Sequence, residues 1–376
     1  MAWLSGYGER ALITVLAAKV GSGGVTNKDV LLTGANMPAN LWANALASGL
    51  DIRVTAADGE TKVNHELVSF TPGSSLMELW FLGASLSSSV NSEFYIYWKK
   101  PGDTGEAASW GQGVWDANHK GVYHLQQTST PALDSTSAAL SLAAVGTPQF
   151  AQTGIIGKGM GFTGDSDGVF SAAASTLDMQ NWTMEAWGYF NNVGATNHFI
   201  CNFSRGEAYS ALGYIWWTNN NQYGLGYNNL IIGYYSAAGF RDHQFAFTPT
   251  VSTWYHFVGI CDAASDLVRC YINGVPQTAQ ADTNNPATPY SPHFMIGNQY
   301  ADTLASPHNL NGLADEVRVS NKVRTAADIL TSYNNQSSPS TFYTVGAAET
   351  LSMGFSRNLF HSGVFGNVFG FGGEQP

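Results

Sequence analysis

The chain has 376 residues, which is enough for two domains that each bury a core without disulfide support. Only 11% of the residues are charged, whereas 13% are aromatic and 41 are glycine, which favours a β-rich protein. The formal net charge of −11 argues against the basic surface that nucleic-acid-binding proteins use, so nucleic acid is not an expected partner.

Residues 1–100 predict a first β-sandwich. Short β-branched and aromatic runs, separated by Gly, Asn, Pro or Asp, recur in ERALITVLAA, DIRVTAADGETKV, LMELWFLGASL and SEFYIYWKK. Asp58 and Gly59 lie between two alternating runs and predict a hairpin turn. The apolar run near the amino terminus follows Glu9 and Arg10 and is too short for a bilayer, so we expect neither a signal peptide nor membrane insertion.

Residues 101–114 are rich in Gly, Ser and Pro and predict a linker. Residues 115–348 follow with at least nine strand-like runs and almost no helix, which is typical of two packed sheets in a jelly roll. Thr325 and Asp328 form a capping signal for one short helix. The predicted fold class is therefore all-β, with two β-sandwich domains of the jelly-roll type.

Residues 349–376 form a tail in which Gly and Phe alternate without the apolar stripe of a strand or helix. We expect an ordered tail that docks on a neighbouring subunit, because exposed phenylalanines would otherwise promote aggregation. The alternative is a tail folded back on its own domain. The predicted docking residues are Phe360, Phe365, Phe369 and Phe371.

The three cysteines, Cys201, Cys261 and Cys270, lack the spacing of a zinc site. Cys261 and Cys270 fall on two strands of one predicted hairpin, where the register makes them diagonal neighbours. We expect free, buried thiols.

The second region resembles a known family, the laminin-G-like or concanavalin A-like sandwiches of the three-element bacterial and phage type. The matching stretches are VYHLQQ, GIIGKGMGFTGDSDGVF, WTMEAWGYF, WYHFVGICDAASDLVRCYINGVP and LNGLADEVRVSNKVRTAADILTSY. The resemblance covers roughly residues 114–348 and implies the fold more than the function, since the family includes lectins, adhesion modules and passive spacers.

The first region is similar to a domain of unknown function that often precedes such sandwiches in secreted and phage proteins. YGERALITV, LDIRVTAADGETKVNHEL and EFYIYW carry this likeness. The chain departs from that family at YWKKPG, where Tyr-Gly-Asn is usual, which concerns only the linker. The domain pair resembles phage virion and tail proteins, which implies a place on a virion surface.

The acidic doublet Asp315–Glu316 is the strongest candidate for chemistry, and we expect it to be structural. Glucan hydrolases on this fold carry alternating carboxylates on one strand, and the sequence has no such strand. Adjacent residues of a strand point to opposite faces, so Asp315 should face the apolar side while Glu316 pairs with Arg318 at the surface. We therefore predict a protein that is not an enzyme and requires no cofactor.

A buried Asp315 needs hydrogen bonds, a counter-charge or a metal ion. In one interpretation it accepts backbone N–H groups of a neighbouring loop. In the other it shares a structural calcium ion with acidic residues of GDSDG, and the predicted ligands are Asp165, Asp167 and Asp315.

A glycan site is predicted in YIWWTNNNQYGLGYNNLIIGYY, because sugars bind aromatic faces beside amide side chains. Trp216 and Trp217 are adjacent, so one should face the core and the other the outside. The alternative is a set of core aromatics and polar turns. The predicted contacts are Trp216, Trp217, Asn219, Asn220, Asn221, Tyr223, Tyr227 and Asn228.

Together these features predict a non-enzymatic phage virion surface protein, such as a capsid decoration, fibre or tail component, that displays a lectin-like domain. We expect other virion subunits as partners, assembly as a homo-oligomer, and host glycan as a ligand. The alternatives are a secreted or cell-surface carbohydrate-binding module and a degenerate glycosidase.

Overall fold

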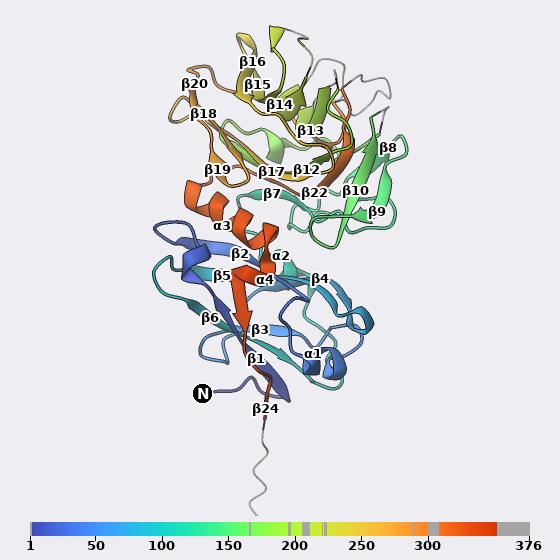
Figure 1. The fold of residues 1–376 in the computed structure, drawn as a ribbon, viewed down its shortest axis with the longest axis vertical. Helices are drawn as coiled ribbons and strands as arrows, with labels where there is room; N and C mark the ends of the chain where they lie inside the picture. The colour runs from blue at the N-terminus through green and yellow to red at the C-terminus, as the bar shows by residue number, and fades with distance from the viewer. Residues whose placement is uncertain are drawn as a thin grey trace, which may run out of the picture.

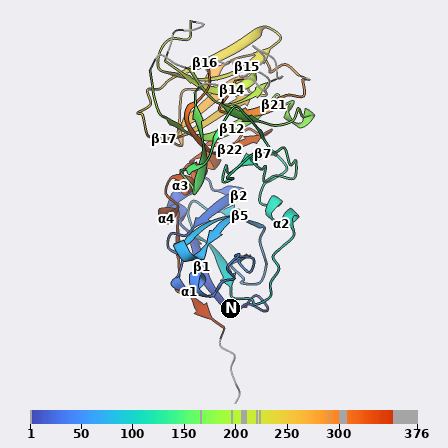
Figure 2. The same ribbon diagram turned by 90° about the vertical axis from the view of Figure 1, so that its right-hand side faces the viewer.

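Strands dominate the chain and form two domains stacked along the long axis of the molecule (Figures 1 and 2). The computed structural model describes residues 2–351, except 165–166, 195–196, 205–210, 220, 222–223, 289 and 300–307. The predicted all-β class with jelly-roll sandwiches is confirmed. Within the described part, every helix is too short or too polar to span a bilayer.

The N-terminal domain packs two antiparallel sheets against each other. One has the order β23-β1-β6-β3, with β24 also on β1, and the other has the order β2-β5-β4. The sequence of β1 alternates so that Ala11, Ile13 and Val15 enter the core. The strands are β1 (Glu9–Val15), β2 (Val25–Thr33), β3 (Arg53–Ala56), β4 (His65–Thr71), β5 (Leu76–Leu86) and β6 (Ser92–Trp98). The short helices are η1 (Ala17–Lys19), α1 (Ala39–Asn44) and η2 (Pro72–Ser74).

The end of the described chain returns to the N-terminal domain. β23 (Tyr343–Val345) and β24 (Glu349–Thr350) both pair with β1, and Tyr343 is fully buried there. The sequence assigned residues 115–348 to the second domain, and this boundary is wrong for β23, whose edge pairing with β1 has no local sequence signal. The predicted linker 101–114 contains helix α2 (Ala108–Gln112) beside β4.

The second domain is a jelly roll of two sheets around one large core. The sheet nearer the N-terminal domain has the order β19-β18-β17-β12-β22-β10-β9, with β20 on β18 and β7 on β22. Its strands are β7 (His119–Tyr123), β9 (Gln149–Thr153), β10 (Lys158–Thr163), β12 (Trp182–Phe190), β17 (Trp254–Asp262), β18 (Leu267–Ile272), β19 (Val275–Pro276), β20 (Gln280–Ala281) and β22 (Asn311–Ser320).

The distal sheet has the order β16-β15-β14-β13-β21-β11-β8 and lies farther from the N-terminal domain (Figure 1). Its strands are β8 (Ala143–Val145), β11 (Gly168–Phe170), β13 (Asn197–Ser204), β14 (Ala211–Thr218), β15 (Asn229–Ser236), β16 (Gly239–Ala246) and β21 (His293–Ile296), and η3 (Ser175–Leu177) precedes β12. All three cysteines are free and buried, as predicted. Cys261 pairs with Val268 and Cys270 with Gly259, so the two thiols are diagonal neighbours.

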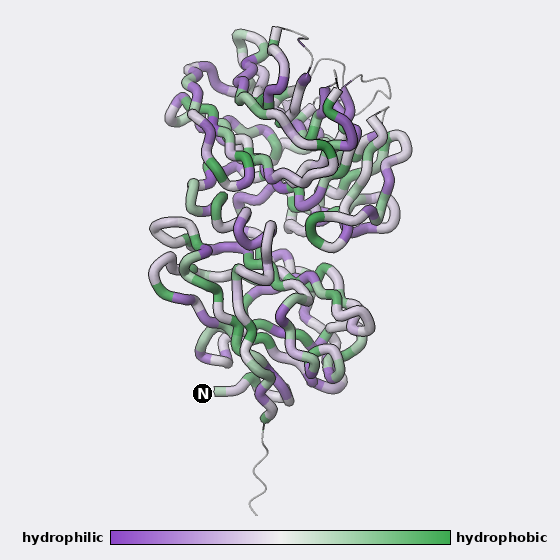
Figure 3. Tube along the Cα trace, in the orientation of Figure 1, coloured by the Kyte–Doolittle hydropathy of each residue, from purple (hydrophilic) through white to green (hydrophobic). Residues whose placement is uncertain are grey.

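Helix α3 (Ala326–Ser337) lies between the two domains, and α4 (Pro339–Phe342) leads from it to β23 (Figure 1). The predicted capping box is present, because Thr325 and Asp328 exchange hydrogen bonds with each other's backbone. Ile329 packs on the jelly roll, whereas Ser332 and Asn335 bond to β2. Hydrophilic residues accordingly lie at the junction as well as on the outside (Figure 3).

Candidate functional site

The acidic doublet lies on a β-bulge in β22. The pairing of β22 with β12 shifts register between Glu185 and Trp187, and Glu316 adopts a left-handed backbone with φ of 48°. Strict alternation therefore fails here, and both Asp315 and Glu316 are fully buried. The expectation of a surface pair between Glu316 and Arg318 is wrong. The pair exists, with 2.9 Å between Oε2 and Nη2, but it lies inside the domain junction.

Asp315 is held by backbone donors. Its Oδ2 accepts the Ile156 N–H at 3.0 Å, and its Oδ1 accepts the Glu316 N–H at 2.8 Å. This arrangement matches the interpretation in which Asp315 accepts backbone N–H groups of a neighbouring loop, and not the one in which it binds calcium. Burial and the nearby Glu316 charge raise the pKa of Asp315 well above its usual range.

The residues predicted to share a calcium ion do not meet in the part of the chain that the structure describes. Asp167 accepts N–H and hydroxyl groups of Thr147 and Thr163. Thr163 pairs with Asn311, four positions before Asp315 along β22, which separates the two carboxylates by roughly 13 Å of strand. Asp165 lies outside the described residues.

The junction contains a compact cluster of Glu78, His124 and Glu316. The His124 Nδ1 atom lies 2.7 Å from Glu316 Oε1 and 3.4 Å from Glu78 Oε1. One ligand atom from each of the three residues lies within 4.8 Å of the others. Glu78 comes from β5, His124 follows β7 and Glu316 comes from β22, so both domains contribute.

Further polar groups orient this cluster. Trp80 Nε1 donates to Glu78 Oε1 at 3.1 Å, and the Trp80 ring stacks on the His124 imidazole. On the other side of the imidazole, Glu66 Oε2 lies 3.6 Å from His124 Nε2. Glu66 is itself fixed by Trp115 Nε1 and the Ser135 hydroxyl, each at 2.7 Å.

Two polar atoms of the cluster remain unsatisfied. Glu78 Oε2 and His124 Nε2 are buried and have no hydrogen-bond partner among the described residues. Buried polar atoms without partners are rare in native proteins and call for an explanation such as a bound ion or ligand. Burial and the Glu316 charge raise the pKa of Glu78 to about 8. Burial lowers the pKa of His124, but the Glu316 carboxylate outweighs this effect and holds the pKa well above its usual range.

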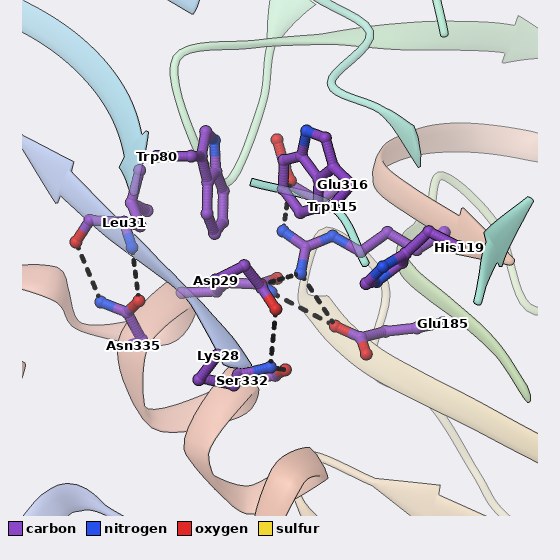
Figure 4. Close-up of polar contacts among 12 residues, drawn as sticks. Lys28, Asp29, Leu31, Trp80, Trp115, His119, Glu185, Glu316, Ser332 and Asn335 are labelled. Atoms are coloured by element: carbon purple, nitrogen blue, oxygen red, sulfur yellow. Dashed lines mark hydrogen bonds and ion pairs between the residues drawn. The ribbon is translucent and has the colours of Figure 1, made fainter. Parts of the chain in front are cut away.

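Arg318 continues the network towards α3. Its guanidinium bonds to Asp29 on β2 and lies over the rings of Trp80 and Trp115, 4.5 and 5.0 Å from their centroids. Lys28 Nζ bonds to Asp29 at 3.1 Å and to the Ser332 hydroxyl at 2.6 Å (Figure 4). Although burial opposes it, the charges of Lys28 and Arg318 lower the pKa of Asp29 to about 2.

A cavity of about 440 Å³ opens beside the cluster, between β4, the segment that follows β7 and the segment around α2. Its polar lining includes Arg53, His65, Glu66, His124, Asp134 and Ser135. His124 is thus the member of the cluster that forms part of the cavity wall.

The predicted glycan residues do not form one exposed platform. Trp217 is fully buried in the jelly-roll core and donates to the Phe247 carbonyl, which removes it from any ligand site. Trp216 faces the other side of β14, but it stacks on Phe199 in a second apolar cluster that includes Leu225. One tryptophan inside and one outside is what strand alternation predicts, yet only 4% of Trp216 is exposed.

The β14–β15 loop carries the remaining predicted glycan contacts. Tyr227 is 63% exposed and Asn221 is exposed, whereas Asn219 donates to the Val193 carbonyl. Asn228 takes a positive φ of 55° beside Tyr227. Asn220 and Tyr223 lie outside the described residues.

The tail residues predicted to dock on a neighbour, Phe360, Phe365, Phe369 and Phe371, also lie outside the described residues. Glu349 lies just before them and pairs with Arg10 at 2.8 Å on the N-terminal domain.

Sequence reasoning missed Glu78 and His124. Glu78 lies within the apolar run LMELWFL, where a charged residue is unusual because carboxylates are rarely buried. Its position in this run was the sequence feature that could have identified it as a site residue. His124 stands in VYHLQQ with no second metal-type ligand nearby in sequence, because its partners come from strands about 46 and 192 positions away.

Residues 163–330 match the concanavalin A-like lectin/glucanases superfamily. Over these residues the chain is similar to that superfamily, in agreement with the sequence resemblance. No curated protein matches the chain.

Two solved structures show what the chain is similar to. Domain 4 of AbnA, an extracellular arabinanase from Geobacillus stearothermophilus solved with arabinotriose, is 19% identical with a TM-score of 0.45, and the match covers 58% of this chain and 100% of that domain. The ligand-binding domain of botulinum neurotoxin serotype D, solved with N-acetylneuraminic acid, is 12% identical with a TM-score of 0.44, over 58% of this chain and 51% of that one. The chain spans about half the length of the neurotoxin domain.

Proposed function

We propose that this protein is a non-enzymatic surface component of a phage virion, which anchors through its N-terminal domain and displays the lectin-like domain outward. The observation that carries this proposal is the position of both ends of the described chain at one end of the molecule. Ala2 and Leu351, the two ends of the described chain, belong to the pole formed by the N-terminal domain, opposite the distal sheet (Figures 1 and 2). A display module needs this arrangement, with attachment at one pole and a free face at the other.

Anchoring is assigned to the N-terminal domain and the tail. β23 and β24 extend the sheet of β1, so the segment that follows residue 351 starts at the anchoring pole. The phenylalanines of the tail would dock on another virion subunit or on another copy of this chain in a homo-oligomer. A capsid decoration, a fibre and a tail component all satisfy this geometry.

A role without catalysis is supported by the positions of the acidic doublet. Asp315 is engaged by two backbone N–H groups, and Glu316 by His124 and Arg318. Groups held in this way support the junction rather than a glycosidic bond, which needs two carboxyl groups facing the substrate. The proposed partners exclude nucleic acid, because the chain is acidic.

Glycan or host-surface binding is assigned to the β14–β15 loop. Tyr227 is the exposed aromatic residue among the predicted contacts that the structure describes, and Asn221 and Asn228 flank it. An aromatic face beside amide groups suits a sugar ring with its polar hydroxyls. The superfamily match supports this assignment.

The display proposal is tested by labelling lysines on purified virions with an acylating reagent. Lys158 on the jelly roll should be modified in intact particles. Lys99 and Lys100, with side chains 43% and 40% exposed at the anchoring pole, should be modified only after dissociation. If the chain is missing from the particles and is found in the medium or on a cell surface, the secreted carbohydrate-binding module replaces this proposal.

The docking role of the tail is tested in the full chain by replacing Phe360, Phe365, Phe369 and Phe371 with alanine. The variant should keep the wild-type unfolding midpoint and fail to join particles. Normal incorporation would assign anchoring to the N-terminal domain alone.

Glycan binding is tested on an array with the full chain. Tyr227→Ala should lower the signal at least 10-fold, whereas Phe240→Ala, which removes a 46% exposed aromatic on β16, should retain it. No bound glycan, or equal loss in both variants, would leave only the structural role.

A further inference from the structure

We propose that Glu78, His124 and Glu316 bind one divalent transition-metal ion, with Zn²⁺ as the best fit, and that this ion links the two domains. The three side chains provide one imidazole nitrogen and two carboxylate oxygens within 4.8 Å of one another. Zinc sites with an open coordination position use three protein ligands of these types. The site is independent of the proposed glycan binding.

The distances within the cluster suit such an ion after small movements. Zinc bonds to nitrogen and oxygen are about 2.0–2.2 Å long, which places neighbouring ligand atoms about 3–4 Å apart. His124 Nδ1 now lies 3.4 Å from Glu78 Oε1 and 2.7 Å from Glu316 Oε1. An ion between these atoms therefore needs His124 and Glu316 to move apart by at least a few tenths of an ångström, while all three ligand atoms already lie within 4.8 Å of one another.

The unsatisfied carboxylate oxygen of Glu78 is an independent indication of a ligand. Glu78 is 1% exposed, and its Oε2 has no hydrogen-bond partner among the described residues. A hydrogen-bonded structural network would use this atom, whereas a metal ion at the carboxylate accounts for a bare second oxygen.

The surroundings of the cluster have the form of the outer shell of a metal site. Ligating histidines commonly donate their second N–H to a carboxylate, and ligating carboxylates are themselves hydrogen-bonded. His124 Nε2 faces Glu66 Oε2 at 3.6 Å, Glu78 accepts from Trp80, and Glu316 Oε2 accepts from Arg318. Glu66, Trp80 and Arg318 are thus positioning residues.

The chemistry of the donors and the access route define the ligand class. An imidazole nitrogen disfavours Ca²⁺ and Mg²⁺, which prefer oxygen ligands, and suits zinc and its neighbours. His124 borders the cavity, so an ion would approach the site from that side. Because Glu78 belongs to the N-terminal domain and Glu316 to the jelly roll, the ion would stabilise the junction between them.

The test measures bound metal in the full chain, without an affinity tag, after chelator treatment and dialysis against Zn²⁺. We expect one Zn²⁺ per chain and a higher unfolding midpoint, and no such shift with Mg²⁺ or Ca²⁺ at the same concentration. Absence of stoichiometric Zn²⁺ in the wild-type chain would overturn the proposal without any variant.

Variants identify the ligands. Glu78→Gln keeps the size of the side chain and should weaken Zn²⁺ binding at least 10-fold, and His124→Gln should do the same. The matched control is Glu185→Gln, another buried carboxylate at the junction, which should bind like the wild type. Wild-type affinity in Glu78→Gln, or an equal loss in the control, would contradict the assignment. With Co²⁺ as the probe, a visible absorption band should appear in the wild type and be lost in Glu78→Gln.

Discussion

Asn335 on α3 bonds to both backbone polar groups of Leu31 on β2. Its Oδ1 accepts the Leu31 N–H at 2.7 Å, and its Nδ2 donates to the Leu31 carbonyl at 3.1 Å (Figure 4). β2 is the edge strand of the order β2-β5-β4, so these groups have no neighbouring strand. The amide therefore replaces a missing strand and closes an edge that would otherwise be open to pairing with other chains.

Replacing Asn335 with alanine should lower the free energy of unfolding by about 2–4 kcal/mol, because two buried backbone groups lose their partners. Asn335→Asp should be worse at neutral pH, since a carboxylate would face the Leu31 carbonyl. Urea denaturation measures both losses. Asn334→Ala is the control, because Asn334 makes a single bond to the Lys19 carbonyl, and it should cost about 1 kcal/mol. Similar losses for the two alanine variants would show that the edge is held by other contacts.

Arg318→Met should destabilise the protein by about 3–5 kcal/mol, because it removes one charged partner from each of the buried carboxylates Asp29 and Glu316. Lys28 alone then compensates Asp29, and His124 alone compensates Glu316. Adding Asn at position 29 should recover part of this loss, with a coupling energy above about 1 kcal/mol. Chemical denaturation of the two single variants and the double variant gives the coupling. Arg269→Met, at a partly exposed pair with Asp262, should cost less than about 1 kcal/mol. Strict additivity would contradict a direct bond between Asp29 and Arg318.

Thr325→Ala should cost about 1 kcal/mol, because the capping box at the start of α3 loses its hydroxyl acceptor. Thr325→Ser retains the hydroxyl and should stay close to the wild type. Thermal unfolding compares the two variants. An equal loss in both would mean that the methyl group of Thr325, and not its hydrogen bond, supports the helix start.

Local sequence patterns predicted much of the fold but little of the junction. The strand run in ERALITVLAA, the diagonal cysteines and the capping box depend on residues close in sequence, and all are confirmed. The inward Trp217 and outward Trp216 also follow from alternation. The alternation pattern does not predict the second apolar cluster, in which Leu225 packs with Trp216. This cluster depends on how the β14–β15 loop folds over the sheet.

The doublet shows why alternation alone is insufficient. A bulge inserts one residue, and its position depends on pairing with β12, about 130 positions earlier in the chain. The positive φ of Glu316 has no sequence signal, because such conformations favour Gly, Asn or Asp. The sequence therefore predicted Asp315 on the apolar face and Glu316 at the surface. It did not predict the cluster that Glu316 forms with Glu78 and His124.

The stability of the protein should fall as the pH drops from 7 to 5, and His65 should account for part of this loss. Burial lowers the pKa of His65 to about 4, whereas an unfolded histidine titrates near about 6.5. Between about pH 4 and about pH 6.5 the unfolded state thus binds more protons at His65 than the folded state does. The stabilising contribution of neutral His65 is therefore fully present above about pH 6.5 and is lost as the pH falls towards 4. One such group contributes about 2 kcal/mol between pH 7 and pH 5.

His65→Gln should flatten this dependence, because glutamine does not titrate and its amide oxygen can still accept the Trp110 N–H that now bonds to His65 Nδ1. Urea denaturation at several pH values gives the slope for each protein. The variant should retain part of the slope, because burial also lowers the pKa of His119 to about 4. Equal slopes in the variant and the wild type would mean that His65 is already protonated in the folded protein at pH 5.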